Sequence, residues 1–400
     1  MNNHNHKTQD LISEGRELGA RMRKEVYKRV FTRDLRLSVV AAVIIISSLS
    51  ITAWAEPSTV NIVSTRDHFD KSGNVLVSDR PYEPYDFGNL GCTQEVLVYV
   101  HGVWTARDKN DEATEGMFEN AIEVADRARL SLESLGYTFP VIGFSWDSDT
   151  DLSQSGWHNA KIVAKENGPK LAHFIADLKE RCPQTAVRII AHSLGARVVL
   201  SSLESLNNNQ GWNNNNFQIT SVHLMGAAVD DDEVSKDPSD VISLDGIKSA
   251  YGEAIEDEVL EFYNLVNHQD DALEPGFINL FFWLASYTIW NPSEKQPVYY
   301  PYYEQDLSIG QSGIQSSISD ENTPKNYLDI IMEEREIPFT LDDADADKTC
   351  DLRYPVPSGF VCTITQDGDN HLGYIGFRGP TPNSLKNDGA MDVVVDTMNP

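Results

Sequence analysis

Ser193 lies in the segment Ala191-His192-Ser193-Leu194-Gly195, between a run of β-branched residues and an amphipathic pattern typical of a helix. A serine at such a junction occupies a tight strand-to-helix turn, and small residues two positions before and after it let the strand and the helix approach closely. Its hydroxyl attacks a carbonyl carbon when a base takes its proton, a third group orients that base and N–H donors meet the oxyanion. The segment therefore predicts that Ser193 is a nucleophile, with alanine replacing the glycine more usual at the first small position.

The same chemistry needs an acid and a base, which follow the serine in the chain order serine, acid, histidine. Asp270 and Asp271 come shortly after the apolar run of residues 259–266, where the end of a strand would place the acid. His371 lies in the segment "QDGDNHLGY", whereas the other nine histidines lie near the N-terminus, in or before the Ser193 segment, inside a predicted strand or beside the aspartate pair. The order predicts a triad of Ser193, His371 and one of the two aspartates.

A second acidic group could supply the acid instead. Acidic runs that follow strands are usually solvated loops, so we favour Asp270 or Asp271. The competing group follows the strand-like run of residues 219–226 and consists of Asp230, Asp231 and Asp232.

The elements that must position these residues alternate between strands and helices. Continuous β-branched runs predict strands that are buried on both faces, and helical patterns follow several of them. This alternation predicts an α/β fold, doubly wound, with a mainly parallel sheet and helices on both faces. The predicted strands are 95–102, 139–146, 186–191, 219–226 and 259–266, with weaker runs at 59–63, 74–77 and 360–365, and the predicted helices are 113–135, 157–181 and 195–206. The asparagine-rich stretch 207–216 is predicted to be a solvated surface loop.

Residues 274–348 break this alternation and are predicted to form an insertion between the last strands. The insertion begins with the aromatic stretch "GFINLFFWLASYTIW" and ends in an acidic loop. The aromatic stretch could be a lid over an acyl pocket, an interfacial membrane patch or the core of a small subdomain. If it is exposed, it points to lipid substrates.

The N-terminal segment of residues 1–55 is predicted to be a signal peptide or a membrane anchor. Basic residues precede the uncharged run of residues 37–55, and "AWA" before Glu56 fits a signal-peptide cleavage site. The same run could span a bilayer as an uncleaved anchor and so associate the protein with a membrane. Both alternatives place the domain of residues 56–400 outside the cytoplasm, secreted or anchored in the cell membrane.

The exported part of the chain is strongly acidic. Residues 56–400 contain 23 basic and 56 acidic residues, a net charge of −33. Such a surface repels phosphate backbones, so nucleic-acid binding by charge is disfavoured. Four cysteines follow the N-terminal segment, where an oxidising compartment would let them pair.

Four segments of the chain together resemble the α/β-hydrolase superfamily. They are the run ending in His101-Gly102, the "AHSLG" segment, the "NHQDDAL" turn and the "DNHLGY" loop. The resemblance extends from about Glu95 to Tyr374, with the insertion as a gap. It is strongest to poorly characterised esterase- or lipase-like members, some of them from salt-loving archaea.

The resemblance implies a role for each site residue. It makes Ser193 the nucleophile, His371 the base and Asp270 the acid, because the aspartate stands three residues before a leucine in similar turns; Asp271 is the alternative acid. It also implies an oxyanion hole formed by the backbone N–H groups of Val103 and Leu194. No cofactor is required for this catalysis.

The fold implied by the resemblance also suggests a pairing of the cysteines. In that fold the strands before His101 and before His192 are parallel neighbours, and Cys92 and Cys182 precede them at similar distances. We therefore expect a Cys92–Cys182 disulfide, which leaves Cys350 to pair with Cys362.

An acidic stretch near residue 350 could bind a cation. Its carboxylates alternate along the chain, and such spacing lets one loop turn its oxygens around calcium. A solvated acidic loop is the alternative. The candidate ligands of this structural calcium are Asp343, Asp345, Asp347 and Asp351.

These features together predict an exported serine hydrolase that cleaves a small-molecule or lipid carboxylic ester through an acyl-enzyme on Ser193. Two other interpretations stay open. One is an extracellular binding module that has the hydrolase fold without turnover, and the other is a peptidase or thioesterase, which differs only in substrate.

Overall fold

The computed structural model of the chain describes one compact unit within residues 58–400. The predicted signal or anchor, the predicted calcium loop, Cys350, Cys362, Asp271 and the strand predicted at 360–365 lie outside the described residues. The described residues are 60–103, 105, 120–151, 154–241, 247–268, 270, 273, 307–332, 371, 373–375, 377–378, 385–387 and 389–398. Among them no helix is long and apolar enough to cross a membrane.

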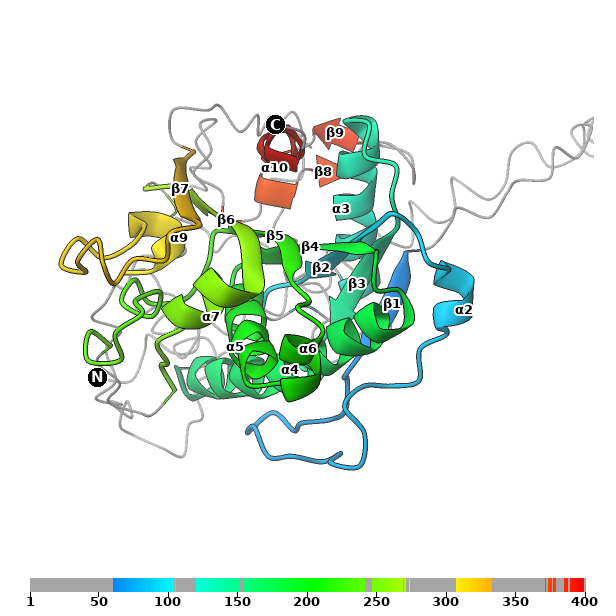
Figure 1. Cartoon of the computed structure of the whole chain (residues 1–400), viewed down its shortest axis with the longest axis horizontal. Helices are drawn as coiled ribbons and strands as arrows, with labels where there is room; N and C mark the ends of the chain where they lie inside the picture. Colours follow the sequence, from blue (N-terminus) through cyan, green and yellow to red (C-terminus); the bar gives the residue numbers. More distant parts are fainter. Residues whose placement is uncertain are drawn as a thin grey trace, which may run out of the picture. The chain divides into compact units, whose positions relative to one another are not determined.

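A seven-stranded sheet forms the centre of the unit, and all of its strand pairs are parallel. The strand order is β1-β3-β2-β4-β5-β6-β7 (Figure 1). The doubly wound, mainly parallel sheet expected from the sequence is therefore confirmed. The strands are β1 (Asn61–Ser64), β2 (Glu95–Val100), β3 (Val141–Ser145), β4 (Ala186–His192), β5 (Ile219–Met225), β6 (Val259–Val266) and β7 (Tyr327–Ile331).

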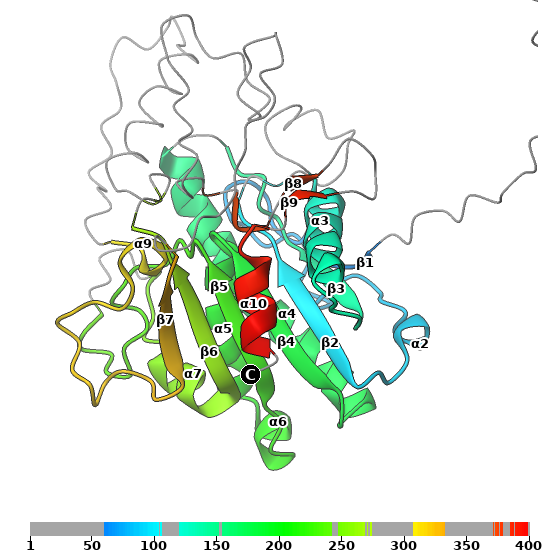
Figure 2. The ribbon, with the colours of Figure 1, turned by 90° about the horizontal axis from the view of Figure 1, so that it is seen from above.

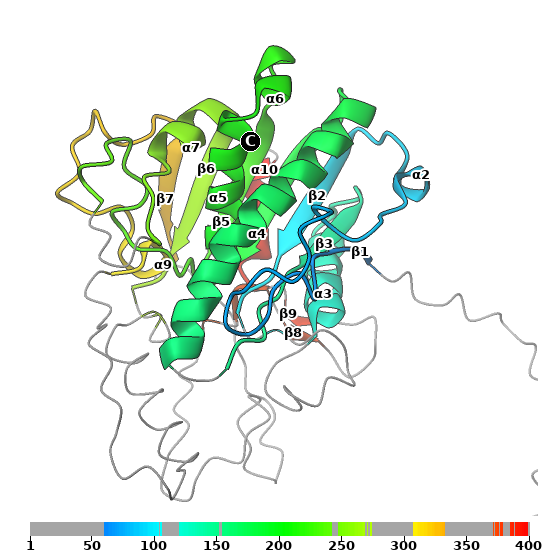
Figure 3. The ribbon, with the colours of Figure 1, turned by 90° about the horizontal axis from the view of Figure 1, so that it is seen from below.

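Helices cover both faces of the sheet. The helices α4 (Gln154–Arg181), α5 (Gly195–Asn207) and α7 (Gly252–Glu258) cover one face, and α3 (Ala121–Ser134) and α10 (Met391–Met398) cover the other (Figures 2 and 3). Each face has its own buried apolar cluster, and every residue of β2 and β3 is buried. Burial on both faces explains why these strands are continuous apolar runs rather than alternating patterns.

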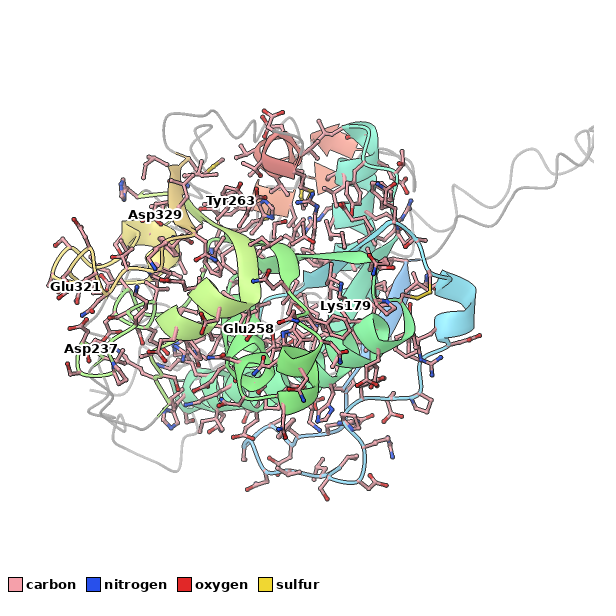
Figure 4. All side chains as sticks on the ribbon, in the orientation of Figure 1. Lys179, Asp237, Glu258, Tyr263, Glu321 and Asp329 are labelled. Atoms are coloured by element: carbon pink, nitrogen blue, oxygen red, sulfur yellow. A yellow bond between two sulfur atoms is a disulfide. The ribbon has the colours of Figure 1, made fainter. Side chains whose placement is uncertain are left out.

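The asparagine-rich stretch 207–216 is not simply a loop, because it contains the short helix α6 (Gln210–Asn214). The Asn209 side chain caps this helix by accepting hydrogen bonds from the Gly211 and Trp212 amides. Trp212 is buried, and its indole N–H donates to the carboxylate of Glu258, the residue labelled at the end of α7 in Figure 4. The exposed asparagines thus surround a helix that one tryptophan anchors.

Part of the predicted insertion belongs to the sheet. Within 274–348, residues 307–332 contribute the short helix α9 (Ile309–Ser312) and the edge strand β7. Asp329 of β7, which is labelled in Figure 4, accepts hydrogen bonds from Asn264 of β6 and from the Ile314 amide after α9. The rest of the predicted lid and acidic loop lies outside the described residues.

The remaining short elements lie before β2 and after β7. The weak run at 74–77 is not a strand, since within the described part of the chain it pairs only through a single bridge between Phe69 and Val75. The other short elements are α2 (Phe87–Leu90), the 3-10 helix η3 (Gly373–Ile375) and the antiparallel pair β8 (Phe377–Arg378) and β9 (Leu385–Asn387).

Cys92 and Cys182 form a disulfide, with their Cα atoms 5.3 Å apart. The bond joins the segment before β2 to the segment before β4, and these two strands are parallel neighbours in the sheet. The predicted pairing is confirmed for these two cysteines.

Candidate active site

Ser193 occupies the turn between β4 and α5 with a φ angle of +54°. A residue other than glycine in this left-handed region stores strain of about 1–3 kcal/mol. Hydrogen bonds from both sides hold it there: the Ser193 N–H donates to Met225 O (3.0 Å), and the Ser193 carbonyl accepts from the Ala228 N–H (3.2 Å). The turn is therefore fixed by the end of the neighbouring strand β5.

Close approach of backbones explains the glycines around Ser193. A Cβ atom on Gly195 would lie 2.5 Å from the His101 carbonyl oxygen, and one on Gly102 would lie 2.9 Å from the Ser193 Cβ. The start of α5 therefore packs directly on the end of β2, and the turn after β2 packs on Ser193. Ala191 is fully buried in the apolar cluster, so its methyl group is accommodated where a glycine is more usual.

Asp270 and His371 lie in direct contact although 101 residues separate them in the chain. The His371 Nδ1 is 2.8 Å from the Asp270 Oδ2, and the Asp270 side chain is fully buried. Because a carboxylate only accepts, Nδ1 carries the proton and Nε2 of the neutral ring is an acceptor. The Asp270 amide donates to the Asn267 carbonyl (3.0 Å), which fixes the turn after β6.

His192 connects the serine turn to the loop of His371. Its Nε2 donates to the His371 carbonyl oxygen (2.7 Å), and the two ring centroids are 4.8 Å apart. Burial, reinforced by the nearby His371, lowers the pKa of His192 to about 3, so the ring is neutral. Among the described residues, His371 makes its hydrogen bonds with His192 and Asp270 and none with the Ser193 hydroxyl. A hydrogen bond between a catalytic base and its nucleophile often forms or tightens only when substrate binds.

The predicted oxyanion donors also lie beside Ser193. Leu194 is the N-cap residue of α5, so its amide belongs to the positive end of that helix. Val103 follows Gly102, which packs against Ser193. Val103 thus follows β2, Ser193 and Leu194 follow β4, and Asp270 follows β6, at the same edge of the parallel sheet. His371 joins them through its contact with Asp270, whereas Asp271 lies outside the described residues.

The competing acidic group has other partners. Asp230 lies 3.3 Å from the Lys248 amine and 3.8 Å from the Arg197 guanidinium. Arg197 also forms a buried bidentate ion pair with Glu233 (2.5 and 2.9 Å). Asp232 lies 3.4 Å from Lys248. These carboxylates are tied to the cations of α5 and of the loop before α7, and it is Asp270 that contacts His371.

A second network, which was not predicted from the sequence, surrounds the turn after β2. Arg66, at the end of β1, is buried and donates to the Thr105 carbonyl (2.8 Å). His101 stacks on Trp146, with ring centroids 5.6 Å apart. In the sequence these residues are marked only by their positions near strand ends. Their contacts could not be predicted, because they join segments far apart in the chain.

No group of three or more potential metal ligands occurs among the described residues. The four aspartates of the predicted calcium loop lie outside them.

Residues 91–275 match a family described as alpha/beta hydrolase of unknown function (DUF900). A search of curated proteins found no match. Similar solved structures include the catalytic core domain of acetyl xylan esterase from Trichoderma reesei, at 9% identity over 43% of this chain and 82% of that chain, with a TM-score of 0.25. Others are Trichoderma reesei cutinase (14% identity, 36% and 59% coverage, TM-score 0.21) and Aspergillus fumigatus lipase B (11% identity, 70% and 55% coverage, TM-score 0.29).

The parallel sheet with helices on both faces is the architecture of an α/β hydrolase, and residues 91–275, somewhat less than half of the chain, match a family of that superfamily. The resemblance read from the sequence is thereby confirmed at the level of the superfamily and of the fold.

Proposed function

We propose that this protein is a serine hydrolase that cleaves carboxylic esters through an acyl-enzyme on Ser193. The observation that carries the proposal is the hydrogen bond between His371 and the buried Asp270, beside a serine held at positive φ on a strand-to-helix turn. Such a turn exposes a nucleophile, and such a pair orients a base.

In the proposed reaction, the His371 Nε2 takes the proton of the Ser193 hydroxyl as its oxygen attacks the ester carbonyl carbon. The Asp270 carboxylate keeps the ring in the required tautomer and stabilises the imidazolium. The oxyanion accepts hydrogen bonds from the amides of Val103 and Leu194. His371 then protonates the departing alcohol, and a water molecule that it deprotonates hydrolyses the acyl-enzyme.

We propose an extracytoplasmic location for this activity, secreted or membrane-associated through residues 37–55. The Cys92–Cys182 disulfide supports an oxidising compartment. The mechanism needs no cofactor, and calcium bound by the predicted loop at Asp343, Asp345, Asp347 and Asp351 would be structural.

Labelling of the full chain with a fluorophosphonate, together with hydrolysis of p-nitrophenyl esters of increasing acyl length, tests the proposal. Ser193→Ala and His371→Ala are expected to abolish labelling and to lower kcat by about 10⁴-fold or more. Ser202→Ala is the matched control, because this buried serine of α5 donates only to the helical Val199 carbonyl. Long-chain preference would support lipid esters.

The alternatives make different predictions in the same experiment. A folded wild-type chain that is not labelled at Ser193 would contradict the proposal and favour a binding module without turnover. Labelling at Ser193 combined with faster cleavage of thioesters or peptides than of oxygen esters would keep the serine mechanism and change the substrate class.

A further inference from the structure

We infer that His101 and Thr105 are positioning residues that fix the direction of the Val103 N–H, the proposed oxyanion donor. The inference rests on the proposed function, because only that function gives the Val103 N–H a catalytic role. It concerns a different set of contacts from the triad, namely the hydrogen bonds to the carbonyl oxygen of Gly102.

The Gly102 carbonyl oxygen accepts two hydrogen bonds from its own turn. One comes from the His101 Nδ1 (2.8 Å) and the other from the Thr105 hydroxyl (3.1 Å). The peptide bond between Gly102 and Val103 is planar and trans, so its C=O and N–H groups point in opposite directions. Two donors that hold the Gly102 oxygen therefore also hold the Val103 N–H on the other side of the peptide plane.

The side chain of His101 is fixed in the tautomer that this bond requires. Its Nε2 accepts from the Trp146 backbone N–H (3.2 Å) and lies 3.3 Å from the Arg66 Nη2, so the ring proton must be on Nδ1. The Trp146 indole N–H donates to the His101 carbonyl (2.8 Å). This bond holds the indole, which stacks on the imidazole, against the backbone of His101. Burial and the nearby Arg66 hold the pKa of His101 well below its ordinary value, in agreement with the neutral tautomer.

Thr105 is fixed in turn by its own carbonyl oxygen. That oxygen accepts from the Arg66 Nη2 (2.8 Å) and from the Ser148 hydroxyl (3.1 Å). Arg66 also donates through Nε to the Ser145 hydroxyl (2.9 Å), so the guanidinium joins β1 and β3 to the turn after β2. Thr105, whose hydroxyl donates to the Gly102 carbonyl, is therefore rigidly supported. Such support is needed to orient a catalytic group to within fractions of an ångström.

The position of this peptide relative to the nucleophile makes its orientation important. Gly102 packs so closely on Ser193 that no Cβ fits between them. Rotation of the next peptide would move the amide out of reach of the oxyanion without moving the serine. Loss of a single oxyanion-hole donor lowers kcat by about 10²–10³-fold, so loss of one of two orienting bonds should lower it by about 10-fold.

The test replaces Thr105 in the full chain. Thr105→Val is expected to lower kcat about 10-fold without raising KM, and to weaken a boronic acid transition-state analogue by a similar factor. Thr105→Ser, which retains the hydroxyl, is expected to restore both. Thr150→Val is the matched control, because Thr150 is an equally buried threonine whose hydroxyl has no partner among the described residues.

NMR of the chain labelled selectively with 15N-valine reports on the environment of the Val103 amide independently of catalysis. The Val103 amide resonance is expected to shift or broaden in Thr105→Val and to stay unchanged in Thr150→Val. An unchanged Val103 resonance, or equal losses of kcat in the two valine variants, would overturn the inference. An inactive wild-type chain whose Val103 resonance responds to Thr105→Val would instead overturn the proposed function and retain the positioning role.

Discussion

At the scale of single residues, the site depends on His192 as much as on its neighbour Ser193. The His192 side chain, directly before Ser193, points to the loop of His371 and donates to the His371 carbonyl. Since Asp270 holds the same histidine through its ring, the backbone and the ring of His371 have separate supports. The turn that holds Ser193, the proposed nucleophile, therefore also positions the loop of His371, the proposed base.

Replacement of His192 separates these two roles. His192→Leu removes the donor to the His371 carbonyl and is expected to lower kcat by about 10–100-fold, because small displacements of a catalytic group are costly. The amide of His192→Gln reaches as far as Nε2 and should recover most of the loss. Steady-state kinetics measure kcat for both variants, and thermal unfolding checks that each is fully folded under the assay conditions. Equal activity of the leucine and glutamine variants would mean that the hydrogen bond does not position the base.

At the scale of elements, the end of β5 packs against Asp270 and His371, the proposed acid and base. Gly226 follows β5 with a φ angle of +53°, and a Cβ there would lie 3.0 Å from the His371 Nδ1 and 3.1 Å from the Asp270 Oδ2. It would also lie 3.0 Å from the Tyr374 ring. The hydrogen bond between acid and base thus passes over a position where only glycine fits.

We expect Gly226→Ala to separate Asp270 from His371 and to lower kcat by about 10²-fold or more. The variant also loses about 1–2 kcal/mol of stability because alanine disfavours positive φ. Gly136→Ala is the control: Gly136 has a φ angle of +92°, and a Cβ there meets nothing within 4 Å. Denaturant unfolding and ester hydrolysis of both variants should show similar stability losses and an activity loss in Gly226→Ala alone. A Gly226→Ala enzyme as active as Gly136→Ala would contradict the packing of the pair on this glycine.

The elements around Ser193 could be predicted because the sequence patterns that define them are local. The buried run of β4, the serine turn and the apolar face of α5 are contiguous in the sequence, so residues 186–207 carry their own pattern. The chain order of α/β-hydrolases then limited the acid and the base to Asp270 or Asp271 and His371. The Cys92–Cys182 pairing followed from the same topology.

Other elements could not be predicted because their stability comes from distant partners. The helix α6 exists in an asparagine-rich stretch because Trp212 is buried against Glu258, which is 46 residues away. Strand β7 is only five residues long, Tyr-Leu-Asp-Ile-Ile, and is half-exposed at the sheet edge. So short a run inside a polar stretch does not stand out by period or hydrophobicity. Arg66 contacts the turn after β2 across 39 residues, and nothing in the sequence marks it as a buried cation.

At the scale of the whole molecule, excess negative charge sets the background for stability. The chain has a net charge of −29 at pH 7, so lower pH relieves self-repulsion in the folded state. Two glutamates of α7 respond to pH in opposite directions on this background. Burial raises the pKa of Glu258 to about 7, whereas hydrogen bonds from Lys236 and Lys325 lower the pKa of Glu256 to about 2.

These opposite shifts predict opposite effects of the same charge change. Glu258 is protonated more readily in the folded than in the unfolded chain, so its contribution to stability is full below about pH 4.5 and is lost as pH rises through about 7. Glu258→Gln keeps an acceptor for Trp212 and should raise the free energy of unfolding at pH 8 by about 1–3 kcal/mol, with little effect near pH 4.5. Glu256→Gln removes the same charge but breaks ion pairs that are present above the ordinary glutamate pKa, so it should lower stability at pH 8. Urea unfolding of both variants from pH 4.5 to pH 8 measures the difference. If both variants were stabilised equally at pH 8, general self-repulsion rather than the burial of Glu258 beneath α6 would control the pH dependence.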